Sequence, residues 1–134
     1  KIGRLQVPEA LLATMRGSPC VRVELSRPMR IALLEEEYAH FLADPSLLAE
    51  CLAPLVPLQG KATIERWNAL ATAHDFDTLV EELLASHYDP VYARSIERNF
   101  PRAAEAIVVA PDAIDEVAYR RVARQLIEAT AGAR

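Results

Sequence analysis

The stretch AIVVA, residues 106–110, is a continuous apolar run that Pro111 ends. A short apolar run of this kind is typical of a strand that is buried on both faces, as in a parallel sheet. A second strand is predicted in PCVRVEL, residues 19–25, where apolar and polar side chains alternate. Because two strands are too few for a stable sheet, we expect further strands upstream of Lys1, or a mostly helical fold with a small sheet.

Helical periodicity occupies most of the remaining chain. Apolar residues three to four positions apart predict helices near 8–15, 28–43, 46–54, 62–73, 76–86 and 114–130. Trp67 lies on the apolar stripe of one of these helices, where we expect core packing rather than stacking on a base. The stretch APLVPLQG, 53–60, contains two prolines and a glycine and is predicted to be a connection. We treat residues 1–134 as a single domain or part of one.

Composition narrows the class of protein. Hydrophobic residues make up 51% of the chain and charged residues 25%. No apolar run approaches the roughly 20 residues of a membrane span, so we expect no membrane partner. Cys20 and Cys51 form neither a disulfide framework nor a CxxC pair, which indicates a reduced, cytoplasmic setting.

The charge is unevenly distributed. The net charge of −4 divides into +4 for residues 1–30 (six basic, two acidic), −9 for 31–90 (two basic, eleven acidic) and +1 for 91–134 (seven basic, six acidic). This distribution argues against a protein that simply coats nucleic acid. It leaves room for a local anion site built from the two ends of the chain.

Two familiar motifs are incomplete. Gly60-Lys61 lacks the earlier glycine and the following Ser or Thr of a phosphate-binding loop, since Leu55 and Ala62 occupy those positions. The three histidines lie in unrelated segments and match no metal-binding spacing, so no metal site is predicted.

Three arginines lie together on the polar side of the last predicted helix, namely Arg120, Arg121 and Arg124. One interpretation is a solvated helix face. The other is contact with RNA phosphate, for which the guanidinium group offers a bidentate fork.

The stretch SHYDPVYARS, residues 86–95, concentrates polar and aromatic side chains around Pro90. Asp89 before Pro90 predicts a structural turn, in which Asp89 caps a new helix and Pro90 occupies its first turn. Capping does not account for Tyr88, Tyr92 and Arg94. Beside the free N–H groups of a helix start, these three could bind a phosphate, or the stretch could serve only as a turn.

The same stretch carries a family resemblance. HYDPVYARS, 87–95, resembles the H/Y-Y-D-P-x-Y signature of bacterial tRNA 2-selenouridine synthases. Two earlier stretches, KIGRLQVPEALLATM (1–15) and VRVELSRPMRIALLEEEYAHF (21–41), are similar to segments that precede this signature in that family. Their order and rough spacing agree as well.

The resemblance implies a fold and an activity. The full-length enzyme has a rhodanese-like domain followed by a P-loop-containing domain. It converts 2-thiouridine at the tRNA wobble position to 2-selenouridine, with geranyl diphosphate and selenophosphate as co-substrates and a geranylated intermediate. This chain matches the C-terminal, mostly helical part of a three-layer α/β P-loop domain with few strands. It holds neither the rhodanese cysteine nor the Walker loop, so we expect it to be inactive alone, without a cofactor of its own.

The resemblance implies tRNA and phosphate-bearing substrates as partners, and we hypothesise which residues bind them. We expect Arg30, Tyr88, Tyr92 and Arg94 to bind phosphate groups of the substrates, and the arginines of the last helix to contact the tRNA anticodon region. No catalytic residue is assigned. The alternatives are a non-catalytic helical interaction module and an orphan P-loop kinase-like protein.

Overall fold

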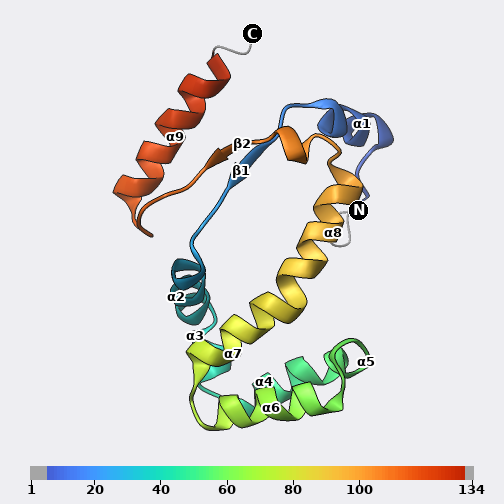
Figure 1. The fold of residues 1–134 in the computed structure, drawn as a ribbon, viewed down its shortest axis with the longest axis vertical. Helices are drawn as coiled ribbons and strands as arrows, with labels where there is room; N and C mark the ends of the chain where they lie inside the picture. Colours follow the sequence, from blue (N-terminus) through green and yellow to red (C-terminus); the bar gives the residue numbers. More distant parts are fainter. Residues whose placement is uncertain (1–5, 132–134) are drawn as a thin grey trace. The chain divides into compact units, whose positions relative to one another are not determined.

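The computed structural model describes residues 6–131, which divide into two compact units (Figure 1). Unit 1 comprises the described residues up to Leu25 and those from Tyr92 onward, and unit 2 comprises Ser26–Val91. The described chain is mostly helical, with two short parallel strands. This confirms the prediction of a helical α/β chain with few strands, whereas the P-loop domain and the single-domain organisation stay predictions.

Unit 1 contains the sheet. Its elements are α1 (Glu9–Gly17), β1 (Val21–Val23), most of α8 (Asp89–Asn99), η3 (Ala103–Glu105), β2 (Ile107–Val109) and α9 (Glu116–Ala131). The two strands pair in parallel, with Val21 opposite Ile107 and Val23 opposite Val109. The parallel pairing predicted from AIVVA is therefore confirmed.

The burial of the sheet differs from the prediction. Val109 is 8% exposed, but the neighbouring Val108 is 47% exposed, so β2 is buried on one face and open on the other. The reason is that α9 packs against β2 and brings Ala118 and Val122 into the small core of the unit. All three residues of β1 are exposed.

Unit 2 is a helical assembly with its own core. It contains α2 (Arg27–Glu37), α3 (Ala39–Leu42), α4 (Pro45–Leu52), η1 (Ala53–Leu55), α5 (Val56–Gln59), α6 (Lys61–Thr72), α7 (Phe76–Leu83), the π-helical η2 (Leu84–Tyr88) and the start of α8. The core consists of the buried residues Leu48, Leu52, Ile64, Trp67, Ala71 and Leu79. Trp67 is fully buried, which confirms its predicted packing role.

A local signal explains where α4 begins. Asp44 caps α4, because its carboxylate accepts from the N–H groups of Ser46 and Leu47. The predicted helix 28–43 is instead divided at Tyr38, where the backbone leaves the helical region.

The prediction of a connection over 53–60 was wrong. The two prolines lie in the first turns of η1 and α5, where a missing N–H is tolerated. The glycine does act as a breaker, because Gly60 adopts φ +86° between α5 and α6.

Candidate functional site

The helix through residues 76–99 does not break at Asp89 and Pro90. Asp89 has helical dihedrals (φ −63°, ψ −45°), and its N–H donates to the carbonyl of Leu84, five residues earlier. The predicted turn is therefore wrong. In a regular α-helix the Pro90 ring would clash with the carbonyl of Ser86, and the helix instead widens to a π-helical turn over 84–88.

A side chain from α5 compensates for the missing proline N–H. The carbonyl of Ser86 would accept from residue 90 in an α-helix, but proline has no N–H to donate. In the structure Gln59 Nε2 donates to this carbonyl at 3.2 Å and lies 3.3 Å from Nδ1 of His87. The π turn thus keeps its polar groups satisfied through a contact between α5 and η2.

Asp89 serves as the acceptor of an arginine cluster. Arg30 donates to both of its carboxylate oxygens, Nη2 to Oδ1 at 2.6 Å and Nη1 to Oδ2 at 3.1 Å. Arg27 Nη2 lies 3.2 Å from Oδ2. The hydrogen bonds from Arg30, and then the charges of both arginines, hold the pKa of Asp89 below its usual value despite partial burial.

Sequence reasoning identified Arg30 but missed Arg27. The available signal was the spacing, since residues three apart on a helix share a face. Both arginines occupy the first turn of α2, where the helix dipole disfavours positive charge and no acidic residue compensates. Asp89 supplies that compensation from α8. The cluster keeps a net charge of +1, and Nη1 of Arg27 is buried without a hydrogen-bond partner among the described residues.

A cavity of about 300 Å³ lies beside Arg27, between α2 and α7. Its acidic lining comes from Glu35 on α2 and from Asp77 and Glu81 on α7. Burial, followed by the negative charge of Asp77, raises the pKa of Glu35. Because these carboxylates repel anions, the cavity does not fit a phosphate group.

The other predicted phosphate ligands are exposed, Tyr88 on η2 and Tyr92 and Arg94 on α8. Tyr88 belongs to unit 2, is 51% exposed and meets the ring of His87 edge-on, with centroids 5.1 Å apart. Tyr92, 68% exposed, and Arg94 lie on the part of α8 that belongs to unit 1. Unit 2 thus brings together Arg30 and Asp89, whereas Tyr92 and Arg94 are displayed by unit 1.

The arginines of α9 are partly neutralised. Arg120 pairs with Glu116 at 2.6 Å, and Arg121 pairs with Asp112. Arg124 is exposed and makes no ion pair among residues 6–131. Of the three, Arg124 therefore offers its charge most directly to a ligand.

The described part of the chain holds no group of three or more His, Cys, Asp or Glu side chains that could bind a metal ion. Within residues 6–131, no helix has the length and apolar character needed to cross a bilayer. In comparisons with known proteins, no family model, curated protein or solved structure matched the chain.

Proposed function

We propose that this chain is the C-terminal segment of a tRNA-modifying transferase similar to the tRNA 2-selenouridine synthases. One observation carries the proposal beyond the sequence motifs themselves. Arg30 lies in one stretch that resembles the family, 21–41, and Asp89 lies in another, 87–95. A bidentate ion pair joins these two residues across 59 positions of the chain. Residues that the resemblance selected separately thus form one structural unit.

In this proposal the whole enzyme converts wobble 2-thiouridine to 2-selenouridine in the cytoplasm, through a geranylated intermediate. Geranyl diphosphate and selenophosphate are its co-substrates, and this segment supplies contacts to phosphate. Tyr92 and Arg94 suit that role because both are exposed on α8, a helix that buries none of its own residues. Arg124 adds an exposed positive charge for the tRNA backbone.

The ion pair refines the proposed role of Arg30. Both terminal nitrogens donate to Asp89, which fixes the planar guanidinium group in one orientation. The remaining N–H groups could still meet a phosphate oxygen. The first task of Arg30 is nevertheless to hold α2 against the start of α8, and Arg94 becomes the leading candidate for phosphate contact.

The test is a binding titration of the purified chain. We expect fluorescence anisotropy to detect micromolar, salt-dependent binding of a tRNA anticodon stem–loop with 2-thiouridine at the wobble position. Arg94→Ala should weaken binding about three- to tenfold, as expected for loss of a phosphate contact. Arg102→Ala is the matched control, because Arg102 already contacts Glu105 and the Gly17 carbonyl. Equal affinities of the two variants would contradict the proposal.

A helical interaction module is the second candidate. The observation that favours it is the exposed apolar and aromatic surface at the end of unit 2, formed by Tyr88 and Val91. Such a surface can serve a protein partner without any chemistry. Failure of the stem–loop to bind, together with no thermal stabilisation by diphosphate, would favour this function.

A further inference from the structure

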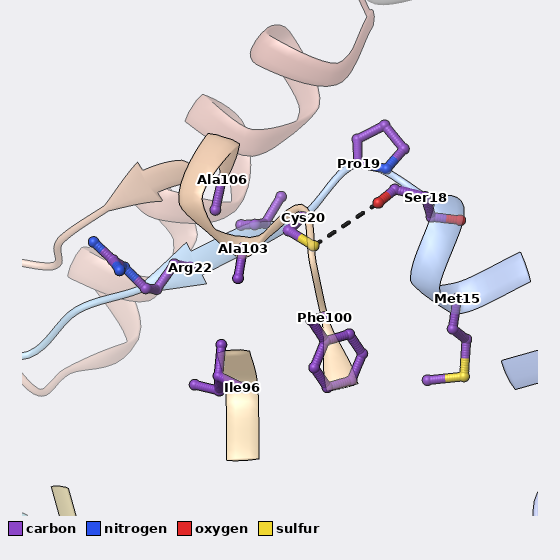
Figure 2. Close-up of a pocket in the computed structure, with 10 residues that line it drawn as sticks. Met15, Ser18, Pro19, Cys20, Arg22, Ile96, Phe100, Ala103 and Ala106 are labelled. Carbon is purple, nitrogen blue, oxygen red and sulfur yellow. Dashed lines mark hydrogen bonds between the residues drawn. The ribbon is translucent and has the colours of Figure 1, made fainter. Parts of the chain in front are cut away.

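The polar side chains that line an apolar hollow in unit 1 already have partners. The hollow has a volume of about 390 Å³, and residues on α1, β1 and α8 contribute to its lining (Figure 2). Sγ of Cys20 donates to the carbonyl of Ser18 at 3.8 Å, and Arg22 pairs with Glu24 at 2.7 Å. The hollow therefore offers nothing that would select one ligand over another. Unit 2 presents a more specific polar arrangement at its π turn.

The Gln59 side chain fixes the tautomer of His87. Its amide nitrogen, Nε2, donates to the carbonyl of Ser86 at 3.2 Å and lies 3.3 Å from Nδ1 of His87. The opposite amide orientation would place an oxygen against the Ser86 carbonyl, so the nitrogen must face both groups. Because an amide nitrogen only donates, Nδ1 of His87 must accept. The imidazole is consequently neutral and carries its proton on Nε2.

The surroundings of His87 provide no partner for a second proton. The ring of Tyr88 meets the imidazole edge-on, with centroids 5.1 Å apart. Among the described residues no carboxylate forms an ion pair with His87. The charged side chains of α6, α7 and the start of α8 meet other groups, namely Lys61 with Glu65, Arg66 with Glu82, Asp89 with Arg30, and Asp77 and Glu81 along the cavity beside Arg27. A proton added to Nδ1 therefore gains no salt bridge that would offset the lost acceptor.

We propose that the contact of Gln59 with Ser86 and His87 is a pH-sensitive device that holds α5 to the π turn only while His87 is neutral. A proton on Nδ1 turns this atom from an acceptor into a donor, so that it repels the amide nitrogen of Gln59. If the amide turns its oxygen towards His87 instead, the Ser86 carbonyl is left without a donor, because Pro90 has no N–H. Histidine side chains change their charge between pH 5 and 8, which places the device in the physiological range. It lies wholly within unit 2 and involves no substrate, so it is independent of the proposed function.

The pH dependence has a definite sign. The folded chain holds His87 in its neutral form, whereas the unfolded chain takes up this proton freely below about pH 6.5. The stabilisation by the contact is therefore complete at pH 8 and is lost as the pH falls to 5.5. Over this interval the ratio of folded to unfolded chain should fall about three- to tenfold on account of His87, tenfold being the limit for a folded state that takes up no proton.

His87→Asn tests this dependence. Its Oδ1 can accept from Gln59 at about the position of Nδ1, but asparagine takes up no proton. Urea unfolding at pH 8 and at pH 5.5, followed by the fluorescence of the buried Trp67, measures the stability of unit 2. All other titrations are common to both proteins, so the unsubstituted chain should lose about three- to tenfold more than His87→Asn between the two pH values. His40→Asn is the matched control, because His40 is exposed on α3 and should leave the pH dependence unchanged.

A carboxylate in place of the Gln59 amide should reverse the sign. In Gln59→Glu the new carboxylate attracts the charged imidazole. The part of the stability that depends on His87 should then rise, rather than fall, from pH 8 to pH 5.5. The comparison of Gln59→Glu with the double variant that also carries His87→Asn isolates this part. An unreversed sign would contradict the proposed contact.

Nitrogen-15 NMR of the imidazole reads the tautomer directly and needs no variant. At pH 8 the signal of His87 Nδ1 should be that of an unprotonated nitrogen, and the signal of Nε2 that of a protonated one. A proton on Nδ1 at pH 8 would overturn the inference. So would an equal pH dependence of stability in the unsubstituted chain and in His87→Asn.

Discussion

Replacing Asp89 with alanine should destabilise unit 2, because the substitution removes the carboxylate that Arg27 and Arg30 share. The two arginines would then face each other without compensation in the first turn of α2. The contact between α2 and α8 would lose its hydrogen bonds, and the helix dipole would oppose both charges.

The magnitude follows from the geometry. Arg30 makes two hydrogen bonds to Asp89, at 2.6 and 3.1 Å, and the Asp89 side chain is 31% exposed. Hydrogen bonds to charged groups contribute about 1.5–3 kcal/mol, whereas exposed ion pairs contribute about 0–1 kcal/mol. A partly screened bidentate pair lies between these limits. We therefore expect Asp89→Ala to lower the free energy of unfolding by about 2 kcal/mol.

Urea unfolding followed by tryptophan fluorescence would measure this loss. Trp67 is the only tryptophan and is fully buried in the core of unit 2, so its emission reports on the relevant unit. Glu65→Ala is the matched control, since Glu65 forms an exposed i,i+4 pair with Lys61 at 3.6 Å. The control should cost less than about 0.5 kcal/mol.

The pH dependence gives an independent check. The pKa of Asp89 is lower in the folded chain than in the unfolded chain. Its contribution to stability is therefore present above the unfolded pKa of about 3.9 and is lost as the pH falls through the folded pKa. The difference between the unsubstituted chain and Asp89→Ala should shrink in the same range. Equal losses for Asp89→Ala and Glu65→Ala at neutral pH would refute the reasoning.

Three further substitutions address other features of unit 2. Glu35→Gln should raise stability at pH 7 and have no such effect below about pH 4. The reason is that burial and the charge of Asp77 raise the pKa of Glu35 and so penalise its ionised form. Urea titrations at both pH values measure the change in stability, and an equal stabilisation at both would contradict the prediction. Trp67→Phe should cost about 1–3 kcal/mol, because it removes the 3.1 Å hydrogen bond to Glu82 and leaves part of the buried volume empty. Urea unfolding followed by circular dichroism measures the loss of stability, and an unchanged midpoint would refute this prediction. Gly60→Ala should cost about 1–3 kcal/mol, because an alanine is strained at φ +86° and ψ 154°. The cost does not come from a clash, because an added Cβ would meet no atom within 4 Å. A thermal midpoint equal to that of the unsubstituted chain would show that the backbone adapts.

The HYDP stretch illustrates how far local reasoning reaches. Its residues are conspicuous in the sequence, and proline chemistry correctly marks a disturbance of the helix at that point. Local rules favoured a break with Asp89 as cap. The helix continues because the Gln59 side chain donates to the Ser86 carbonyl and because Arg30 donates to the Asp89 carboxylate. Both partners lie far away in sequence, so no local rule could have indicated them.

Sequence reasoning found only part of the cluster of Arg27, Arg30 and Asp89, because its members are distant in sequence. Arg30 and Asp89 were both selected from the sequence, but as a phosphate ligand and a turn residue rather than as an ion pair. Arg27 was missed, because an arginine at the start of a helix has no distinct local signature. The acidic cavity beside it depends on the packing of α2 against α7.

The sequence by itself determined the places of the two strands, of the longer helices and of the buried Trp67. These features follow from periodicity, side-chain capping and backbone preference, which act over a few residues. The tertiary structure decided the role of Asp89 and the contact of Gln59 with the π turn. Those depend on which distant groups meet, because an ion pair and a hydrogen bond between helices are defined by partners that the local chain does not contain.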